Sequence, residues 1–167
     1  IQADEAITGF SSLGPSAIFN TRTNTTSKEL THKEIENIIE DFGKAAKRVK
    51  DAGFDGVEIH GAHGYLLSQF FSPLTNKRTD LYGGEVLNRI RLHLEVIKKV
   101  REVVGEEYPV FIRLGASDYA EGGVTIEDSL IAAKEFEKAG VDVLDISGGL
   151  NGYKVENESE EGYFWPL

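Results

Sequence analysis

The sequence contains no cysteine and no methionine. Without cysteine, the chain forms no disulfide, no thiolate nucleophile and no cysteine-ligated zinc site. Its apolar runs are all shorter than the roughly 20 residues that a membrane-spanning helix needs, and it does not open with a signal-peptide pattern. We therefore expect a cytoplasmic protein without a membrane partner. Because the chain begins at Ile1 and lacks an initiator methionine, we expect a processed, truncated or engineered product.

Positive charge is also scarce. The 167 residues include 18 Lys and Arg against 28 Asp and Glu, which gives a net charge of −10. Nucleic acids and anionic membrane surfaces require basic surface, so this balance argues against both as partners. The hydrophobic share of 40% is that of a folded globular chain, and the length suits one domain with a core of its own.

Three segments have the apolar periodicity of helices. The first opens with Thr31 and Glu34, whose spacing is that of a capping box, in which each side chain satisfies a backbone N–H. In the third, we expect Leu130, Ala133 and Phe136 to face inward. Each segment ends at a glycine, a common helix stop. The expected helices lie within residues 31–53, 87–105 and 125–140.

Strand-like runs follow the helices, and the alternating order predicts a parallel α/β sheet with right-handed crossovers. In the first run, Val57 and Ile59 share one face, whereas Glu58 and His60 share the other. An open doubly wound sheet, covered on both faces, prefers apolar residues on both. A (β/α)8 barrel tolerates polar inward residues at its carboxyl rim. We therefore predict part of a TIM barrel with about three central strands, at residues 56–61, 110–114 and 141–147.

The rest of the chain is rich in turn-forming residues. We expect one domain segment over 1–167, with a loop-rich opening over 1–30 and a loop-rich tail over 148–167 that ends in a short aromatic run. We also expect loop over the long connection 61–84.

The densest group of chemical side chains is His60, His63 and Tyr65, at the end of the first predicted strand. Imidazoles can donate hydrogen bonds to a carbonyl or an oxyanion, and a phenol can deliver a proton. The alternative is that these side chains only satisfy backbone groups of a loop. A metal site on the two histidines is a weaker interpretation, because no third ligand has suitable spacing.

Arg113 ends the second predicted strand on the face opposite the helix-facing residues. A guanidinium there can stabilise negative charge on a ligand, or it can form a structural ion pair with Glu58 or Asp145. After the third strand, the glycines in 147–149 allow the backbone to approach a cofactor, although they also suit a plain turn. Dinucleotide and P-loop fingerprints are absent from the sequence.

Residues 54–67 read Phe-Asp-Gly-Val-Glu-Ile-His-Gly-Ala-His-Gly-Tyr-Leu-Leu. This run resembles the central signature of the old yellow enzyme family of FMN-dependent ene-reductases, and the similarity covers nearly all of residues 15–153. Further matching positions are Gln69-Phe70, Ser72-Pro73, Asn76, Arg78, Asp80, 82–84, Asn88-Arg89, Arg91, Arg113, 116–119 and 145–149.

The resemblance implies an FMN-binding TIM barrel that reduces the C=C bond of α,β-unsaturated carbonyl compounds with NADH or NADPH. His60 and His63 match the pair that hydrogen-bonds the substrate carbonyl oxygen and lies against the flavin, and Tyr65 matches the proton donor to the α-carbon. Arg113 matches the arginine beside the flavin N1–O2 edge. Histidine at position 63, where other members have asparagine, resembles the bacterial branch with the thermophilic-like and xenobiotic-reductase enzymes.

A complete barrel of this kind takes about 250 residues. The family's first strands, which contact the flavin edge, and its last strands, which hold the phosphate, have no counterpart in the sequence. We therefore expect the central part of such an enzyme. The alternative is a catalytically silent barrel fragment that holds no flavin alone and self-associates as a homo-oligomer through its open strand edges. A metal-dependent aldolase or hydrolase barrel is a third and weaker interpretation.

Overall fold

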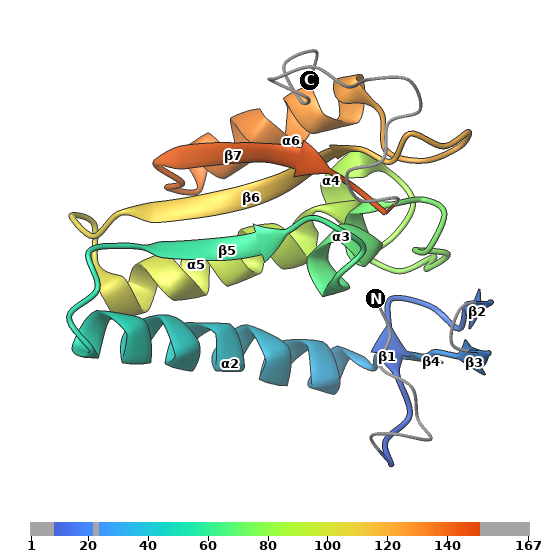
Figure 1. Ribbon diagram of the computed structural model, residues 1–167, viewed down its shortest axis with the longest axis horizontal. Helices are drawn as coiled ribbons and strands as arrows, with labels where there is room; N and C mark the ends of the chain where they lie inside the picture. Colours follow the sequence, from blue (N-terminus) through green and yellow to red (C-terminus); the bar gives the residue numbers. More distant parts are fainter. Residues whose placement is uncertain (1–8, 22–23, 151–167) are drawn as a thin grey trace.

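The computed structural model describes residues 9–21 and 24–150, and its centre is a parallel sheet of three strands (Figure 1). The strands are β5 (Val57–Gly61), β6 (Val110–Ser117) and β7 (Val143–Gly148), in the order β5-β6-β7. Both neighbouring pairs are parallel. The predicted strands and their parallel order are confirmed, and β6 runs three residues beyond its expected end.

In residues 9–21 and 24–150, helices cover one face of this sheet and leave the other open. The long helices are α2 (His32–Asp51), α5 (Arg91–Val104) and α6 (Ile126–Lys138). Figure 1 shows α5 and α6 behind the strands, and α2 packs beside α5. The capping box is present, since Thr31 accepts from the Glu34 backbone N–H and the Glu34 carboxylate accepts from the Thr31 backbone N–H. The connections between the parallel strands thus place the three long helices on the same side, as a barrel wall requires.

The core lies between the sheet and these helices, and it explains the pattern of the strands. Ile59 on β5 and Ile112 and Leu114 on β6 are 2% exposed or less, and they pack with buried residues of α5 and α6 such as Ile97 and Phe136. Burial of such side chains contributes roughly 1.5–3 kcal/mol each, which fixes the apolar parity toward the helices. The polar parity therefore faces the open side.

The connection from β5 to α5 is more regular than its sequence suggested. Leu66–Phe71 forms the short helix α3, although we expected loop. The second predicted helix is divided into α4 (Val86–Arg89) and α5 at Ile90, whose backbone angles leave the regular helix. Leu130 is 57% exposed on α6, so its predicted inward position was wrong; Ala132, one position before Ala133, is buried instead.

Before α2, residues 13–29 contain four two-residue strands rather than loop alone. β1 (Leu13–Gly14) pairs in parallel with β4 (Lys28–Glu29), and β2 (Phe19–Asn20) pairs antiparallel with β3 (Thr25–Thr26). We call residues 13–29 the N-terminal arm. Arg78 holds this arm against the rest of the fold by donating to the carbonyl oxygens of Pro15 and Leu30, at 3.1 and 2.7 Å. Of the predicted loop-rich tail over 148–167, Gly148 ends β7. The residues from 151 on, with the aromatic run, lie outside the described residues.

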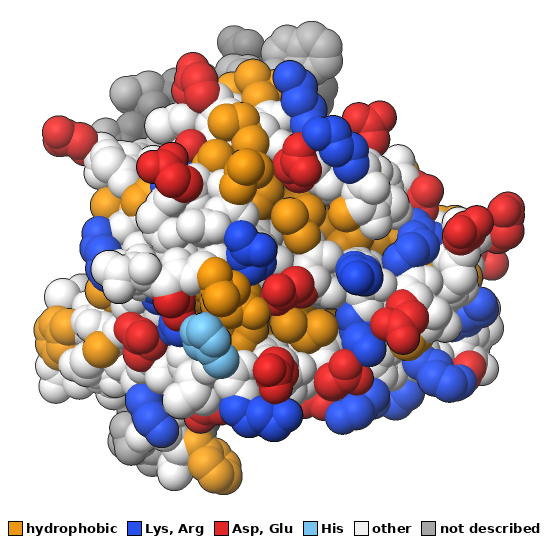
Figure 2. Space-filling model, turned by 180° about the vertical axis from the view of Figure 1, so that it is seen from behind, with side chains coloured by type: hydrophobic (Ala, Val, Ile, Leu, Met, Phe, Trp, Pro, Cys, Tyr) orange, Lys and Arg blue, Asp and Glu red, His pale blue; other side chains and the backbone are white. Residues whose placement is uncertain are grey.

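The helical side of the molecule carries both signs of charge, interspersed with small apolar areas (Figure 2). The exposed apolar residues of α6, Leu130 and Ile131, are 57% and 41% exposed. In the described part of the chain, no helix has the length and hydropathy that crossing a membrane demands.

Candidate active site

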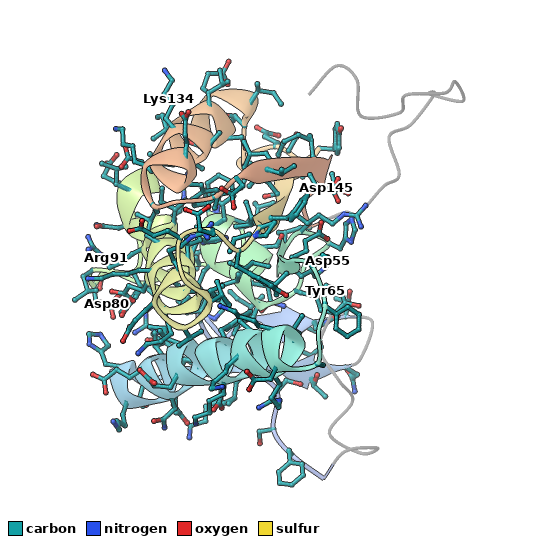
Figure 3. The ribbon with its side chains drawn as sticks, turned by 90° about the vertical axis from the view of Figure 1, so that its left-hand side faces the viewer. Asp55, Tyr65, Asp80, Arg91, Lys134 and Asp145 are labelled. Atoms are coloured by element: carbon teal, nitrogen blue, oxygen red, sulfur yellow. The ribbon has the colours of Figure 1, made fainter. Side chains whose placement is uncertain are left out.

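A row of three charged or titratable side chains crosses the open face of the sheet. The register pairs His60 on β5 with Arg113 on β6, and Arg113 with Asp145 on β7. Residues opposite one another on neighbouring strands share a face, so these side chains stand side by side. The row lies near the carboxyl end of β5 but in the middle of β6 and β7, so the prediction that Arg113 ends its strand was wrong. Figure 3 shows Asp145 and Tyr65 on the side of the molecule opposite Arg91 and Lys134.

Arg113 and Asp145 form an ion pair, with Nε of the arginine 3.3 Å from a carboxylate oxygen. The structural ion pair expected for Arg113 is thus present, with Asp145 as the partner. Glu58, the other expected partner, lies on the same face and is exposed. The contact with Asp145 does not meet the geometry of a hydrogen bond, however, and Nε of Arg113 is buried without a hydrogen-bond partner in the described part of the chain. Because Arg113 is 38% exposed, its guanidinium keeps donor capacity for a ligand on the open face.

The loop after β5 brings the remaining predicted side chains to this row. The His60 ring centroid lies 5.1 Å from that of His63 and 5.0 Å from that of Tyr65. His63 has a φ of 59°, in the left-handed region that histidine tolerates better than most residues. A Cβ on Gly61 would meet the Arg113 carbonyl oxygen at 2.9 Å, so glycine permits the close approach of β5 and β6 here. His60, His63, Tyr65 and Arg113 therefore gather at one edge.

His60 and His63 both favour the neutral form of the imidazole. Burial lowers the pKa of His60, and the nearby positive charge of Arg113 lowers it further, whereas Asp145 acts in the opposite direction. Burial is also the largest cause that lowers the pKa of His63, followed by the neighbouring His60 and Arg113. A neutral imidazole offers one N–H donor and one acceptor nitrogen. The edge can thus present hydrogen-bond donors to a carbonyl oxygen without carrying imidazolium charge.

Sequence reasoning missed one direct partner of this group. Ser147, at the end of β7 and 1% exposed, lies with its Oγ 2.6 Å from Nε2 of His63. The backbone N–H of His63 also donates to the carbonyl oxygen of Gly148, at 3.2 Å. His63 and Ser147 are 84 positions apart in the chain. Only the parallel register of three strands, which the sequence pattern does not fix, could have indicated this contact.

A second missed residue, Asp118, organises the rim around the site. Its buried carboxylate accepts from the hydroxyl of Ser72 at 2.6 Å and from the backbone N–H groups of Val124 and Leu150 at 2.8 and 2.7 Å. A Cβ on Gly149 would clash with that carboxylate, which explains the glycine by packing. Asp118 thereby fixes the end of α3, the loop before α6 and the exit from β7.

A metal centre has little support from the geometry. Among the described residues there is no group of three or more His, Cys, Asp or Glu side chains placed to hold a metal ion. The two histidines of the edge instead contact each other, Tyr65 and Ser147.

Comparison with known proteins identifies the family of this chain. Residues 3–155 match the NADH:flavin oxidoreductase / NADH oxidase family, and the chain belongs to that family. It is 48% identical to a NADH oxidase of Thermoanaerobacter brockii over 85% of this chain and 22% of that protein. It is 47% identical to a NADPH dehydrogenase of Geobacillus sp. (strain WCH70) over 82% of this chain and 40% of that protein.

Solved structures give the same result for the fold. An old yellow enzyme homologue from Zymomonas mobilis has a TM-score of 0.75 and 32% identity over 86% of this chain and 44% of its own. A 2-naphthoyl-CoA reductase complex has a TM-score of 0.79 and 38% identity over 84% of this chain and 22% of its own. The resemblance to old yellow enzymes and the partial TIM barrel are confirmed. The chain spans 22% to 40% of the curated relatives it matches here.

Family membership implies FMN as cofactor with NADH or NADPH as reductant. The residues on the open face fit a flavin ring. Arg113 has a partly exposed guanidinium, and His60 stands beside it in the register. A polar ring edge that accepts hydrogen bonds and tolerates negative charge matches such donors.

Proposed function

We propose that a longer flavoprotein carrying this segment reduces the C=C bond of α,β-unsaturated carbonyl compounds, with NADH or NADPH as electron source. The observation that carries the proposal is the meeting of two imidazoles and a phenol within ring contact, beside Arg113, at the carboxyl edge of a barrel wall. In barrels of this type, the carboxyl edge of the strands is the catalytic face.

His60 and His63 bind the carbonyl oxygen of the substrate through ring N–H groups. When a hydride adds to the β-carbon, enolate charge develops on that oxygen, and hydrogen bonds to it strengthen. FMN, when bound, would supply the hydride, and Arg113 and His60 are the residues that would hold its ring. The lowered pKa values of both histidines favour neutral donors, which orient the substrate without protonating it.

Tyr65 delivers the proton to the α-carbon. Its ring contacts that of His60, and its side chain is 43% exposed on the open face, where a ligand can reach it. A phenol is a suitable acid for a carbon that gains carbanion character. Arg113, a fixed cation beside the expected ring position, would stabilise negative charge there.

The test separates the two half-reactions in the longest natural chain that carries this sequence, loaded with FMN. We expect Tyr65→Phe to slow anaerobic reduction of cyclohexenone by about 10²-fold or more, because general acid catalysis contributes that much, while flavin reduction by NAD(P)H stays nearly unchanged. Tyr108→Phe is the matched control: the Tyr108 hydroxyl donates to the Phe54 carbonyl at the opposite end of the sheet. Equal alkene rates for wild type and Tyr65→Phe would refute the proton-donor role.

A second candidate is a catalytically silent fragment that self-associates. Within the described residues β5 and β7 each pair only with β6, and Val143 on β7 is 42% exposed. Unpaired strand edges promote association. The purified 167-residue chain tests this candidate by its colour after desalting and by its size in solution. A monomer that retains a flavin spectrum would refute it.

A further inference from the structure

Ser147 and His63 form a contact that can hold only one arrangement of protons. A serine hydroxyl has a single proton to donate, and a neutral imidazole has one donor and one acceptor nitrogen. The Ser147 Oγ lies 2.6 Å from Nε2 of His63. One of the two groups must therefore donate to the other, and the burial of Ser147 decides which.

Ser147 is 1% exposed, so water does not satisfy its hydroxyl. Over residues 9–21 and 24–150, His63 Nε2 is the one hydrogen-bond partner found for Ser147 Oγ. If Nε2 were protonated and donated, the serine proton would be buried without an acceptor, which costs more than a formed hydrogen bond returns. The arrangement that satisfies both groups has Ser147 donating to Nε2.

We propose that Ser147 is a positioning residue that holds His63 as the Nδ1–H tautomer and thereby presents Nδ1–H as a donor to the open face. The second tie, from the His63 backbone N–H to the Gly148 carbonyl at 3.2 Å, fixes the backbone that carries the ring. Among the described residues, no hydrogen-bond partner is found for Nδ1 of His63, so its proton is available to a ligand.

The consequence is a preorganised donor. Without the hydroxyl, the imidazole can turn or shift its proton to Nε2. The ring must then be reordered when a ligand carbonyl binds, and the free-energy cost of that reordering weakens binding. The lowered pKa of His63 is consistent with a neutral ring, for which the tautomer decides which nitrogen donates. The identity of the ligand as a carbonyl compound rests on the proposed function, whereas the tautomer does not.

The experiment uses the longest natural chain carrying this sequence, loaded with oxidised FMN and labelled with ¹⁵N-histidine. Long-range ¹H–¹⁵N spectra report which ring nitrogen of His63 is protonated, with the signal assigned by its loss in His63→Asn. We expect a protonated Nδ1 in the wild type. In Ser147→Ala we expect a mixed or Nε2–H ring, and in Ser147→Thr, which keeps the hydroxyl, a restored Nδ1–H form.

The functional readout is binding of cyclohexanone, which has the carbonyl oxygen but no reducible C=C bond, followed by the flavin absorbance. We expect Ser147→Ala to weaken this binding about tenfold, the order of one hydrogen bond, and Ser147→Thr to recover it. Ser129→Ala is the control, because the buried Ser129 hydroxyl donates to the Ala116 carbonyl at 2.7 Å and does not touch His63.

An Nε2–H ring in the wild type overturns the proposal, even if Ser147→Ala does not fold. An unchanged tautomer and unchanged ketone affinity in a folded Ser147→Ala also overturn it. Failure of the wild-type enzyme to reduce an enone refutes the proposed function instead, and it leaves the tautomer result standing.

Discussion

His93 is a buried imidazole whose removal should change how stability depends on pH. It lies on α5 with no exposed surface, stacked on Phe136 at a centroid distance of 5.5 Å and edge-on to Phe71. Among the described residues, neither of its ring nitrogens has a hydrogen-bond partner. Burial lowers the pKa of His93 from 6.5 to about 3. The perturbation we choose is His93→Leu, which keeps an apolar side chain of similar size.

The sign follows from proton binding. Between pH 6.5 and about 3, the unfolded chain binds a proton at this position and the folded chain does not. Above pH 6.5 neither state binds a proton at His93, so the group has no effect on how stability depends on pH. The folded state loses stability as the pH falls through this window. Each pH unit costs about 1.4 kcal/mol, so His93 removes about 3 kcal/mol of unfolding free energy between neutral pH and about pH 4.

The assay is urea unfolding of wild type and His93→Leu, followed by circular dichroism, at several pH values from about 7.5 down to about 4. We expect the stability of the variant relative to wild type to rise by about 3 kcal/mol over this range. The difference at the highest pH gives the effect of the substitution on packing alone and is subtracted. Parallel stability curves for the two proteins would refute the reasoning, because they would mean that the folded state protonates His93 as readily as the unfolded state.

Two further predictions concern stability. Arg78→Met removes the ion pair with Asp80 at 2.6 Å and the bonds to the Pro15 and Leu30 carbonyls; we expect a loss of about 3–5 kcal/mol in urea unfolding, and a loss below about 1 kcal/mol would contradict the role of Arg78 as the tie of the N-terminal arm. Thr31→Ala removes the N-cap of α2; we expect a loss of about 1 kcal/mol by thermal unfolding, and an unchanged midpoint would contradict the contribution of the capping box.

The framework of the sheet was predictable because its signals are local. The capping box at Thr31, the glycine stop at Gly105 and the alternation in 57–61 each depend on a few neighbouring residues. Parity also placed His60 and Arg113 on one polar face before any pairing was known. These features are written in short stretches of chain, where propensity and periodicity act directly.

The missed features depend on contacts between distant segments. Helix α3 is six residues long, most of them buried on every side, and Tyr65 provides no side-chain cap, so neither periodicity nor a start signal marks it. Leu130 is exposed because no neighbouring element of the described chain packs on that side of α6. The bonds of Ser147 to His63 and of Asp118 to Leu150 join residues 84 and 32 positions apart, which no local pattern encodes.

The left-handed backbone at position 63 limits the side chains that can occupy it. With φ at 59°, a β-branched or bulky residue would be strained, whereas asparagine, aspartate and histidine are the side chains most often tolerated. Of these three, only asparagine and histidine donate a hydrogen bond at neutral pH. Histidine is thus one of two side chains in this group that suit the turn and can also donate a hydrogen bond. The backbone conformation, and not only the reaction, thus restricts which residue can occupy position 63.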